Sequence, residues 1–315
     1  MVNQKQLAAP DIEVQKLHVY FPVHKGLVKA VDNVSITFKH GQITGIIGES
    51  GCGKSVLGQA ILGILPEYVQ RSGQIFYRNA DIFKDNTVIP HFYGQEFALI
   101  PQNPGEALNP LRKIGQQFDD ILLTAAISDA DRHYKTSLLQ FFGLHDCRRV
   151  LASYPHELSG GMLQRVLGAM SICCSPVWLL ADEPTKGLDE TACAVVYENL
   201  TKIKTKTDLG MLIITHDLQL AASICNNIAV MYAGQLVEYG PHVLTSPKHP
   251  YTQAFLAALP VNGFQPLAGL APSPQDKLQG CSFAPRCKNN MPRCHKEKPP
   301  ACKLESAEVR CFLYA

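Results

Sequence analysis

The segment "GESGCGKS" (residues 48–55) constrains this chain more than any other feature, because it fits the pattern G-x-x-x-x-G-K-[ST]. An apolar run, "ITGII", precedes it and a helix-forming run, "KSVLGQAILGIL", overlaps its end. In that strand–turn–helix setting the pattern predicts a loop whose backbone N–H groups bind phosphate oxygens. Lys54 is expected to reach the β and γ phosphates of a nucleotide, and Ser55 to bind Mg²⁺. The candidate phosphate-binding residues are Gly48, Ser50, Gly51, Gly53, Lys54 and Ser55.

The pattern of apolar residues predicts an α/β fold. Short β-rich runs alternate with helical periodicity through about residue 240, which is typical of a sheet covered by helices. After Asp189, apolar residues recur at helical spacing, and Asp189 can cap the first turn. Helical signals dominate between residues 102 and 171, so we expect a helical subdomain inserted at about 103–172 within a first domain of residues 1–240. A composition rich in Pro and Cys then predicts a separate C-terminal appendage, residues 241–315.

Two further segments indicate phosphate chemistry. "VWLLADE" predicts a buried strand that ends in Asp182, a partner for Mg²⁺, followed by Glu183. We expect Glu183 to polarise an attacking water, because phosphoryl transfer requires mainly positioning and charge stabilisation. "LSGGMLQR" places Ser159, Gly160 and Gly161 at the start of a helix, where they form a second anion-binding turn. One nucleotide does not obviously need both turns, so the second suits a γ phosphate presented by another subunit.

These motifs together resemble the nucleotide-binding subunits of ATP-binding cassette (ABC) transporters. In order, they are Walker A "GESGCGKS", Q-loop "PQNPGEALNP", signature "LSGGMLQR", Walker B "WLLADEP", D-loop "GLD" and switch histidine "ITHD", and the match covers nearly the whole chain. The resemblance implies a P-loop ABC-type nucleotide-binding domain that hydrolyses ATP with Mg²⁺.

The resemblance also implies roles for individual residues. Gln102 would sense the nucleotide, bind Mg²⁺ with Ser55 and lie near the membrane partner. Asp189 would bridge a dimer interface, and His216 would contact the γ phosphate. Phe21, or alternatively Tyr20, would stack on adenine. The chain departs from the common family pattern at Lys186 and Met162, and neither departure removes a catalytic group.

Two short segments resemble one branch of that family, the ATPases of bacterial oligopeptide, dipeptide and nickel importers. They are "HPYT" (residues 249–252) and "LNP" (residues 108–110). The branch implies a second ATPase subunit, usually a different chain, two membrane permease subunits and an external solute-binding protein. It also implies a peripheral position on the cytoplasmic face of the inner membrane. Peptide is the first expectation for the solute, with nickel or another small solute left open.

A soluble ABC-type ATPase that acts on ribosomes or DNA is the alternative from another class. Such proteins usually carry two cassettes or long coiled-coil insertions, and this chain has neither. A net charge of +2 gives no global attraction to nucleic acid, so no nucleic-acid partner is expected. The N-terminus lacks a secretory signal, and the most apolar stretch is too short and too interrupted to span a membrane. We therefore expect a protein that stays inside the cell.

Five of the 11 cysteines lie in the last 35 residues, at positions 281, 287, 294, 302 and 311. A reducing compartment disfavours disulfides and favours a metal site. Some members of the importer branch carry a similar set with an iron–sulfur cluster, so the resemblance implies that Cys281, Cys287, Cys294 and Cys311 bind one [4Fe-4S] cluster. Zinc and metal-free thiols remain alternatives, and Cys302 is an alternative to Cys311 as the fourth ligand.

Overall fold

The computed structural model describes residues 10–24, 26–78, 80–82, 93–102, 107–125, 127, 132–259, 263, 265–273, 275–276 and 278–315. The chain divides into two compact units. The described residues of one unit lie between 86 and 213, and those of the other lie within 10–85 and 214–315. We call them the signature unit and the phosphate-loop unit, after the glycine turn that each contains.

An antiparallel sheet forms one layer of the phosphate-loop unit. Its strands are β1 (Ile12–Val23), β2 (Gly26–Phe38), β4 (Gln70–Tyr77) and β5 (Ala80–Asp81), in the order β2-β1-β4-β5. In register, Ile12 lies opposite Phe38 and Tyr20 opposite Lys29. Apolar side chains such as Val14, Leu17 and Val19 are buried, and strong pairing along β1 keeps the neighbouring Tyr20 and Phe21 at fixed positions.

A second sheet in the same unit carries the phosphate-binding loop and the C-terminal segment. β3 (Ile43–Ile47) runs parallel to β9 (Asn227–Tyr232), and β9 forms a hairpin with β10 (Gln235–Gly240). All five residues of β3 are buried, as expected of a strand covered on both faces. The helices of this unit are α1 (Lys54–Leu62), α8 (Leu218–Ile224) and α9 (Pro250–Ala257).

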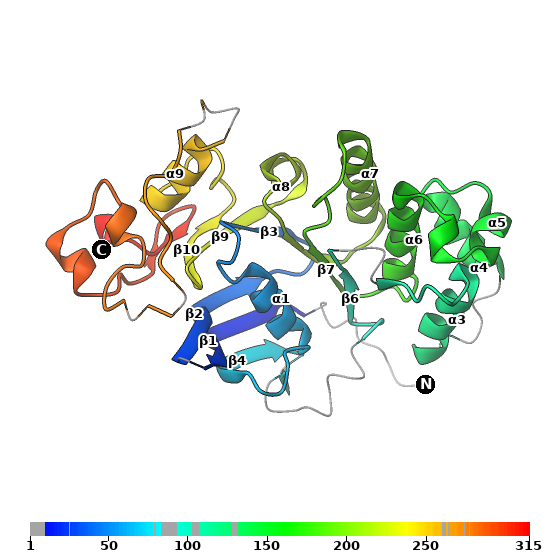
Figure 1. Cartoon of the computed structure of the whole chain (residues 1–315), viewed down its shortest axis with the longest axis horizontal. Helices are drawn as coiled ribbons and strands as arrows, with labels where there is room; N and C mark the ends of the chain where they lie inside the picture. Colours follow the sequence, from blue (N-terminus) through cyan, green and yellow to red (C-terminus); the bar gives the residue numbers. More distant parts are fainter. Residues whose placement is uncertain are drawn as a thin grey trace. The chain divides into compact units, whose positions relative to one another are not determined.

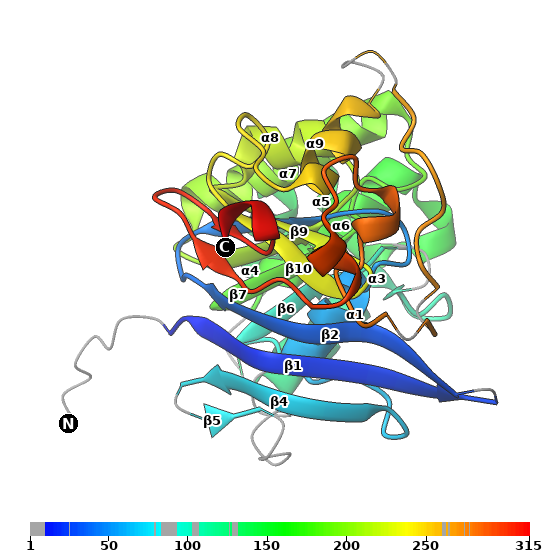
Figure 2. The same ribbon diagram turned by 90° about the vertical axis from the view of Figure 1, so that its left-hand side faces the viewer.

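The C-terminal segment continues this sheet. β12 (Glu308–Val309) pairs with β10 and with β11 (Cys302–Lys303), and Figure 2 shows this orange and red segment beside β10. Single-turn 3₁₀ helices at Ala284–Arg286, Pro292–His295 and Phe312–Tyr314 make up much of the remainder. With so little regular structure, the segment depends on its contacts with β10 and α9 for its shape.

The signature unit contains β6 (Phe97–Ile100) and β7 (Trp178–Asp182), which are parallel, and all but the last residue of β8 (Gly210–Ile214), which lies beside β7. Its helices, drawn in green in Figure 1, are α3 (Ile114–Thr124), α4 (Arg132–Phe141), α5 (Cys147–Ala152), α6 (Gly160–Ile172) and α7 (Glu190–Lys206). A 3₁₀ turn at Pro155–Glu157 leads to the signature segment.

The α/β class is confirmed, as are the strands predicted from "ITGII", "VWLLAD" and "MLII" and the helix after Asp189. The helices α3 to α6 lie within the range predicted for the helical subdomain, of which residues 103–106, 126 and 128–131 lie outside the described part of the chain. The domain limits at 103–172 and 240 stay predictions. Among the residues that the structure describes, no helix is long and apolar enough to cross a membrane.

Candidate active site

The phosphate-binding loop begins where β3 ends and leads directly into α1. A Cβ atom on Gly48 would lie 2.2 Å from the carbonyl oxygen of Met231, and one on Gly53 would lie 2.0 Å from that of Ala30. Both glycines also have positive φ angles, 149° and 102°, which disfavour other residues. A Cβ on Gly51 would meet nothing within 4 Å. The loop is therefore pressed against β2 and β9 on one side and is open at Gly51.

Lys54 lies inside this loop. It is 6% exposed, and its Nζ donates to the carbonyl oxygens of Gly48 (2.9 Å) and Glu49 (3.0 Å). Ser55 follows in the first turn of α1, so its hydroxyl lies at the positive end of the helix dipole. A buried ammonium, a helix N-terminus and backbone amides are groups that attract an anion.

The two aromatic candidates for adenine binding differ in their surroundings. The hydroxyl of Tyr20 donates to Asp32 Oδ1 (2.8 Å), and His18 Nδ1 lies 2.8 Å from the same hydroxyl. Phe21 is half-buried and makes an edge contact with Tyr68, at 6.4 Å between ring centroids. Tyr20 is thus tied into a polar network, whereas the ring of Phe21 packs against another aromatic ring.

The turn after β8 carries His216, which is exposed. Asp217 caps α8 by accepting from the backbone N–H of Leu220 (3.0 Å), and Thr215 Oγ1 accepts from the N–H of Asp217 (2.9 Å). These bonds fix the backbone on both sides of the histidine, so His216 stands at a defined point at the end of a buried strand.

In the signature unit, β7 ends at the two predicted carboxylates. Asp182 is half-buried, and Glu183 is 9% exposed. Glu183 has φ 49°, a left-handed conformation that is uncommon for glutamate. Its carbonyl accepts from the N–H of Lys186 (3.0 Å), which helps to hold that backbone in place. Backbone strain of this kind concentrates at functional sites.

The signature turn is built differently from the phosphate-binding loop. Ser159 caps α6 by accepting from the N–H of Met162 (3.3 Å). Added Cβ atoms on Gly160 and Gly161 would meet nothing within 4 Å, and neither glycine has a positive φ. Asp189 caps α7 in a similar way, accepting from Ala192 N–H at 2.8 Å. The exposed Gln102 precedes residues 103–106, which lie outside the described part of the chain.

The structure gathers the predicted residues into two sets, one in each unit. The phosphate-loop unit holds Phe21, Gly48, Ser50, Gly51, Gly53, Lys54, Ser55 and His216. The signature unit holds Gln102, Ser159, Gly160, Gly161, Asp182, Glu183 and Asp189. Sequence reasoning missed Glu49 and Arg286, whose side chains bond although 237 positions separate them. Local sequence patterns do not link positions so far apart.

Four of the C-terminal cysteines line one small pocket. They are Cys281, Cys287, Cys294 and Cys311, and the pocket does not include Cys302, whose Sγ lies 3.8 Å from the carbonyl oxygen of Pro300. All five are free thiols.

Burial raises the pKa of Cys281 to about 11, and the neighbouring Cys294 and Cys311 add to the increase. Within the described residues, no group of three or more His, Cys, Asp or Glu side chains is arranged to hold a metal ion. The pocket therefore brings the four predicted ligands together without forming a metal site.

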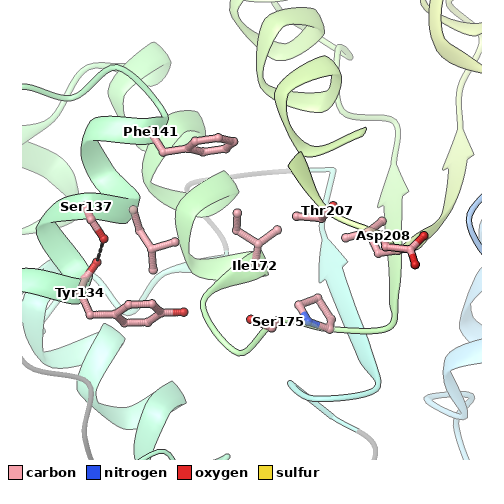
Figure 3. A pocket seen from close by; sticks show the side chains of 10 residues that line it. Tyr134, Ser137, Phe141, Ile172, Ser175, Thr207 and Asp208 are labelled. Carbon is pink, nitrogen blue, oxygen red and sulfur yellow. Dashed lines mark hydrogen bonds between the residues drawn. The ribbon is translucent and has the colours of Figure 1, made fainter. Parts of the chain in front are cut away.

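A larger pocket, of about 550 Å³, lies in the signature unit. Figure 3 shows Tyr134, Ser137 and Phe141 of α4 facing it, with Ile172 at the end of α6 and Thr207 after α7. The hydroxyl of Tyr134 is occupied, because it donates to the carbonyl of Cys173 (2.6 Å). None of the predicted site residues lines this pocket.

A glycine loop with a buried lysine after one strand, and paired carboxylates at the end of another, define a P-loop nucleotide-binding protein. Comparison with known families refines this class. Residues 31–186 match the model described as "ABC transporter", and residues 237–294 match "Oligopeptide/dipeptide transporter, C-terminal region".

Curated proteins similar to this chain match it over nearly their full length. "Dipeptide transport ATP-binding protein DppD" of Bacillus subtilis (strain 168) is 38% identical over 96% of this chain and 94% of its own length. The protein of the same name from Escherichia coli (strain K12) is 38% identical over 91% of both chains. "Oligopeptide transport ATP-binding protein AppD" of Bacillus subtilis is 35% identical over 96% of both.

Solved structures agree on the fold. The dimeric ABC transporter cassette MJ0796 has a TM-score of 0.63 at 23% identity, covering 71% of this chain and 96% of that one. The structure of cbiO1 from Clostridium perfringens has a TM-score of 0.61 at 25% identity, covering 74% of this chain and 88% of that one. The chain therefore belongs to the ABC transporter family, as one of its ATP-hydrolysing subunits.

Proposed function

We propose that the protein is the ATP-hydrolysing subunit of a bacterial ABC importer for dipeptides or oligopeptides. The observation that carries this proposal is the likeness to dipeptide and oligopeptide transport proteins over 96% of the chain, including the C-terminal region. These relatives favour a transporter over a soluble ATPase that acts on ribosomes or DNA. Nickel or another small solute is the alternative cargo for the same subunit, since the ATPase does not itself define the cargo.

The reaction is the hydrolysis of ATP, for which this chain supplies binding and positioning. The loop amides and Lys54 would bind the β and γ phosphates, and Phe21 would stack on adenine. Oxygen ligands suit Mg²⁺, and the hydroxyl of Ser55 and the side-chain oxygen of Gln102 are of this kind; bound Mg²⁺ neutralises phosphate charge. Glu183 would accept a proton from the attacking water, with Asp182 supporting the metal and His216 contacting the γ phosphate.

Replacement of the proposed base tests this function. Glu183→Gln removes the proton acceptor but keeps the size of the side chain, so hydrolysis by the assembled transporter should slow roughly 10²- to 10⁴-fold while ATP still binds. Peptide uptake into membrane vesicles should fall in parallel. Undiminished hydrolysis would remove Glu183 from this role, and uptake of nickel but not of peptides would replace the proposed cargo.

The proposed assembly contains a second ATPase chain, two permeases and an external solute-binding protein. Gly160 and Gly161 support a composite site, because none of the residues that the structure describes comes close enough to require glycine there. A phosphate presented by the partner ATPase could approach the exposed helix N-terminus closely. Asp189 would lie at the same interface. Attachment to permeases would place the chain at the cytoplasmic face of the membrane, and co-purification with both permeases tests this.

We also propose that the C-terminal cysteines bind a [4Fe-4S] cluster. The support is their convergence on one pocket, the absence of Cys302 from its lining, and free thiols at all four positions. The segment from Cys281 to Ala315 carries seven Lys or Arg and three Glu, and this positive charge suits an anionic cluster. The thiols must lose their protons and draw together to bind iron.

Metal analysis of anaerobically purified protein tests the cluster. Brown protein with about four irons per chain is expected. Cys311→Ser should lose the iron, and Cys302→Ser should keep it. Colourless protein that contains one zinc, or none, would exclude the cluster, and the reverse behaviour of the two variants would exchange the fourth ligand.

A further inference from the structure

The C-terminal segment contacts the phosphate-binding loop at Glu49, the second residue of that loop. The carboxylate of Glu49 accepts two bonds from the guanidinium of Arg286, Nη1 to Oε2 at 3.1 Å and Nη2 to Oε1 at 3.2 Å. The backbone N–H of Glu49 donates to the hydroxyl of Tyr251 in α9 (3.0 Å), and its carbonyl accepts from Lys54 (3.0 Å). Glu49 is therefore held at three points, of which two come from the chain beyond residue 240.

Arg286 is fixed in the orientation that this pairing needs. Its side chain is 6% exposed, against 27% for Glu49. Nε donates to the carbonyl of Ala268 (3.0 Å), and Nη1 also lies 3.2 Å from the hydroxyl of Tyr232. Burial by itself would lower the pKa of Arg286. Its hydrogen bonds to Glu49 and Tyr232 together have the larger, opposite effect, so the pKa is raised. A planar, paired guanidinium of this kind holds a carboxylate in one geometry.

Packing around the pair explains why the segment can hold it. Phe283 makes edge contacts with Tyr232 (5.3 Å between centroids) and Tyr251 (5.5 Å). Tyr251 is fully buried, and Pro250 and the capping His249 fix the start of its helix. Arg286 ends the 3₁₀ helix Ala284–Arg286 and directly precedes Cys287. An aromatic cluster thus connects the cysteine-bearing segment to the phosphate-binding loop.

The charge of Glu49 gives the pair a consequence for ATP binding. A carboxylate in a loop that binds phosphates repels the nucleotide unless a cation neutralises it. We propose that Arg286 is a positioning residue for the phosphate-binding loop, which it serves by neutralising Glu49 and holding the loop in its binding shape. This inference rests on the proposed binding of ATP by that loop. It assigns to the C-terminal segment a part in nucleotide affinity that is separate from metal binding.

Calorimetric titration of the full-length chain with MgATP tests the proposal. Arg286→Gln leaves the carboxylate unpaired, so ATP affinity should fall about three- to tenfold. Arg293→Gln is the matched control, since Arg293 also precedes a cysteine but bonds to the carbonyl of Phe312 (2.6 Å) and lies over its ring. It should leave ATP affinity unchanged. Thermal unfolding without nucleotide and iron content check each variant for general damage.

A second substitution separates positioning from folding. If Arg286 acts through the charge of Glu49, then Glu49→Gln should recover most of the affinity that Arg286→Gln loses. The proposal would be overturned if Arg286→Gln reduced ATP affinity equally in the parent and in the Glu49→Gln variant, or if it did not reduce affinity at all. Neither result would affect ATP binding by the parent. Failure of the parent to bind ATP would instead overturn the proposed function. Should Arg286→Gln not fold, Arg286→Met replaces it, because methionine removes the charge and keeps an unbranched side chain. A loss of affinity that Glu49→Gln removes supports the pairing, and unchanged affinity overturns it.

Discussion

The two glycine turns of this protein use glycine for different reasons. In the phosphate-binding loop, Gly48 and Gly53 have positive φ angles and lie against backbone carbonyls, so the fold itself requires them. In the signature turn, Gly160 and Gly161 have neither property. The first turn is shaped by contacts within the chain, whereas the second leaves its helix N-terminus clear. Glycines that the described residues do not require are what the proposed approach of a phosphate from another subunit would need.

The largest expected effect comes from the turn that is shaped internally. Gly53→Ala places a Cβ atom 2.0 Å from a backbone oxygen of Ala30, at a φ of 102°. The loop has to move to accommodate it, because the close contact is with backbone and not with a flexible side chain. ATP affinity of the full-length chain should fall about 100-fold or more, as measured by calorimetry. Near-normal affinity would show that the two turns do not differ as described.

Substitution in the signature turn should affect a different site. Ser159→Arg adds bulk where the turn is exposed, so this chain should keep its own ATP affinity. Hydrolysis at the partner's nucleotide should fall about 10- to 100-fold, because the turn would no longer donate to that phosphate. To measure each nucleotide site separately, the proposed base is replaced by glutamine in one ATPase subunit at a time, and the remaining hydrolysis is assayed. Weakened ATP binding by this chain, with a normal partner site, would contradict a composite arrangement.

Sequence patterns anticipated both turns and most of the surrounding elements. The strand–glycine–helix order predicted β3 and α1, and the position of Asp189 predicted the start of α7. These features are local, so a few neighbouring residues determine them. The pairing of Glu49 with Arg286 spans 237 positions and arises from packing of the C-terminal segment, which no local pattern encodes. The left-handed backbone at Glu183 was also missed, because glutamate rarely adopts that conformation and no neighbouring residue predicts it.

The helix that supports the phosphate-binding loop should respond to pH. His249 caps α9 by accepting from the N–H of Tyr251 (3.0 Å), and burial lowers the pKa of His249 to about 4, from 6.5. The unfolded chain therefore binds the proton more readily between pH 6.5 and 4, and stability falls as pH decreases through that range. Between pH 7 and 5 the histidine should cost about 1 to 2 kcal/mol of unfolding free energy.

Comparison with a capping residue that does not titrate isolates this effect. His249→Asn keeps a capping side chain that does not titrate. The difference in unfolding free energy between variant and parent should therefore change with pH, whereas groups that titrate in both proteins cancel. Glu238 accepts from the backbone N–H of His249 (2.9 Å) in each protein, and its pKa, raised by burial, acts in the opposite direction. Urea unfolding at a series of pH values measures the difference, and a constant difference would exclude His249 as its source.

The smallest expected effect tests the comparison most directly, because it predicts a gain in stability with a loss of function. Gly160→Ala places a methyl group in open space at a helical backbone position, so the unfolding free energy should rise by about 0.5 kcal/mol. Gly51→Ala is the matched control: its Cβ also meets nothing within 4 Å, but its φ is 78°, so it should lower stability by about 1 kcal/mol. Urea unfolding of the nucleotide-free chain measures both.

The assembled transporter with Gly160→Ala should nevertheless hydrolyse ATP more slowly, since the methyl group obstructs a phosphate from outside the chain. A variant that is both more stable and fully active would show that the signature glycines do not serve a second molecule.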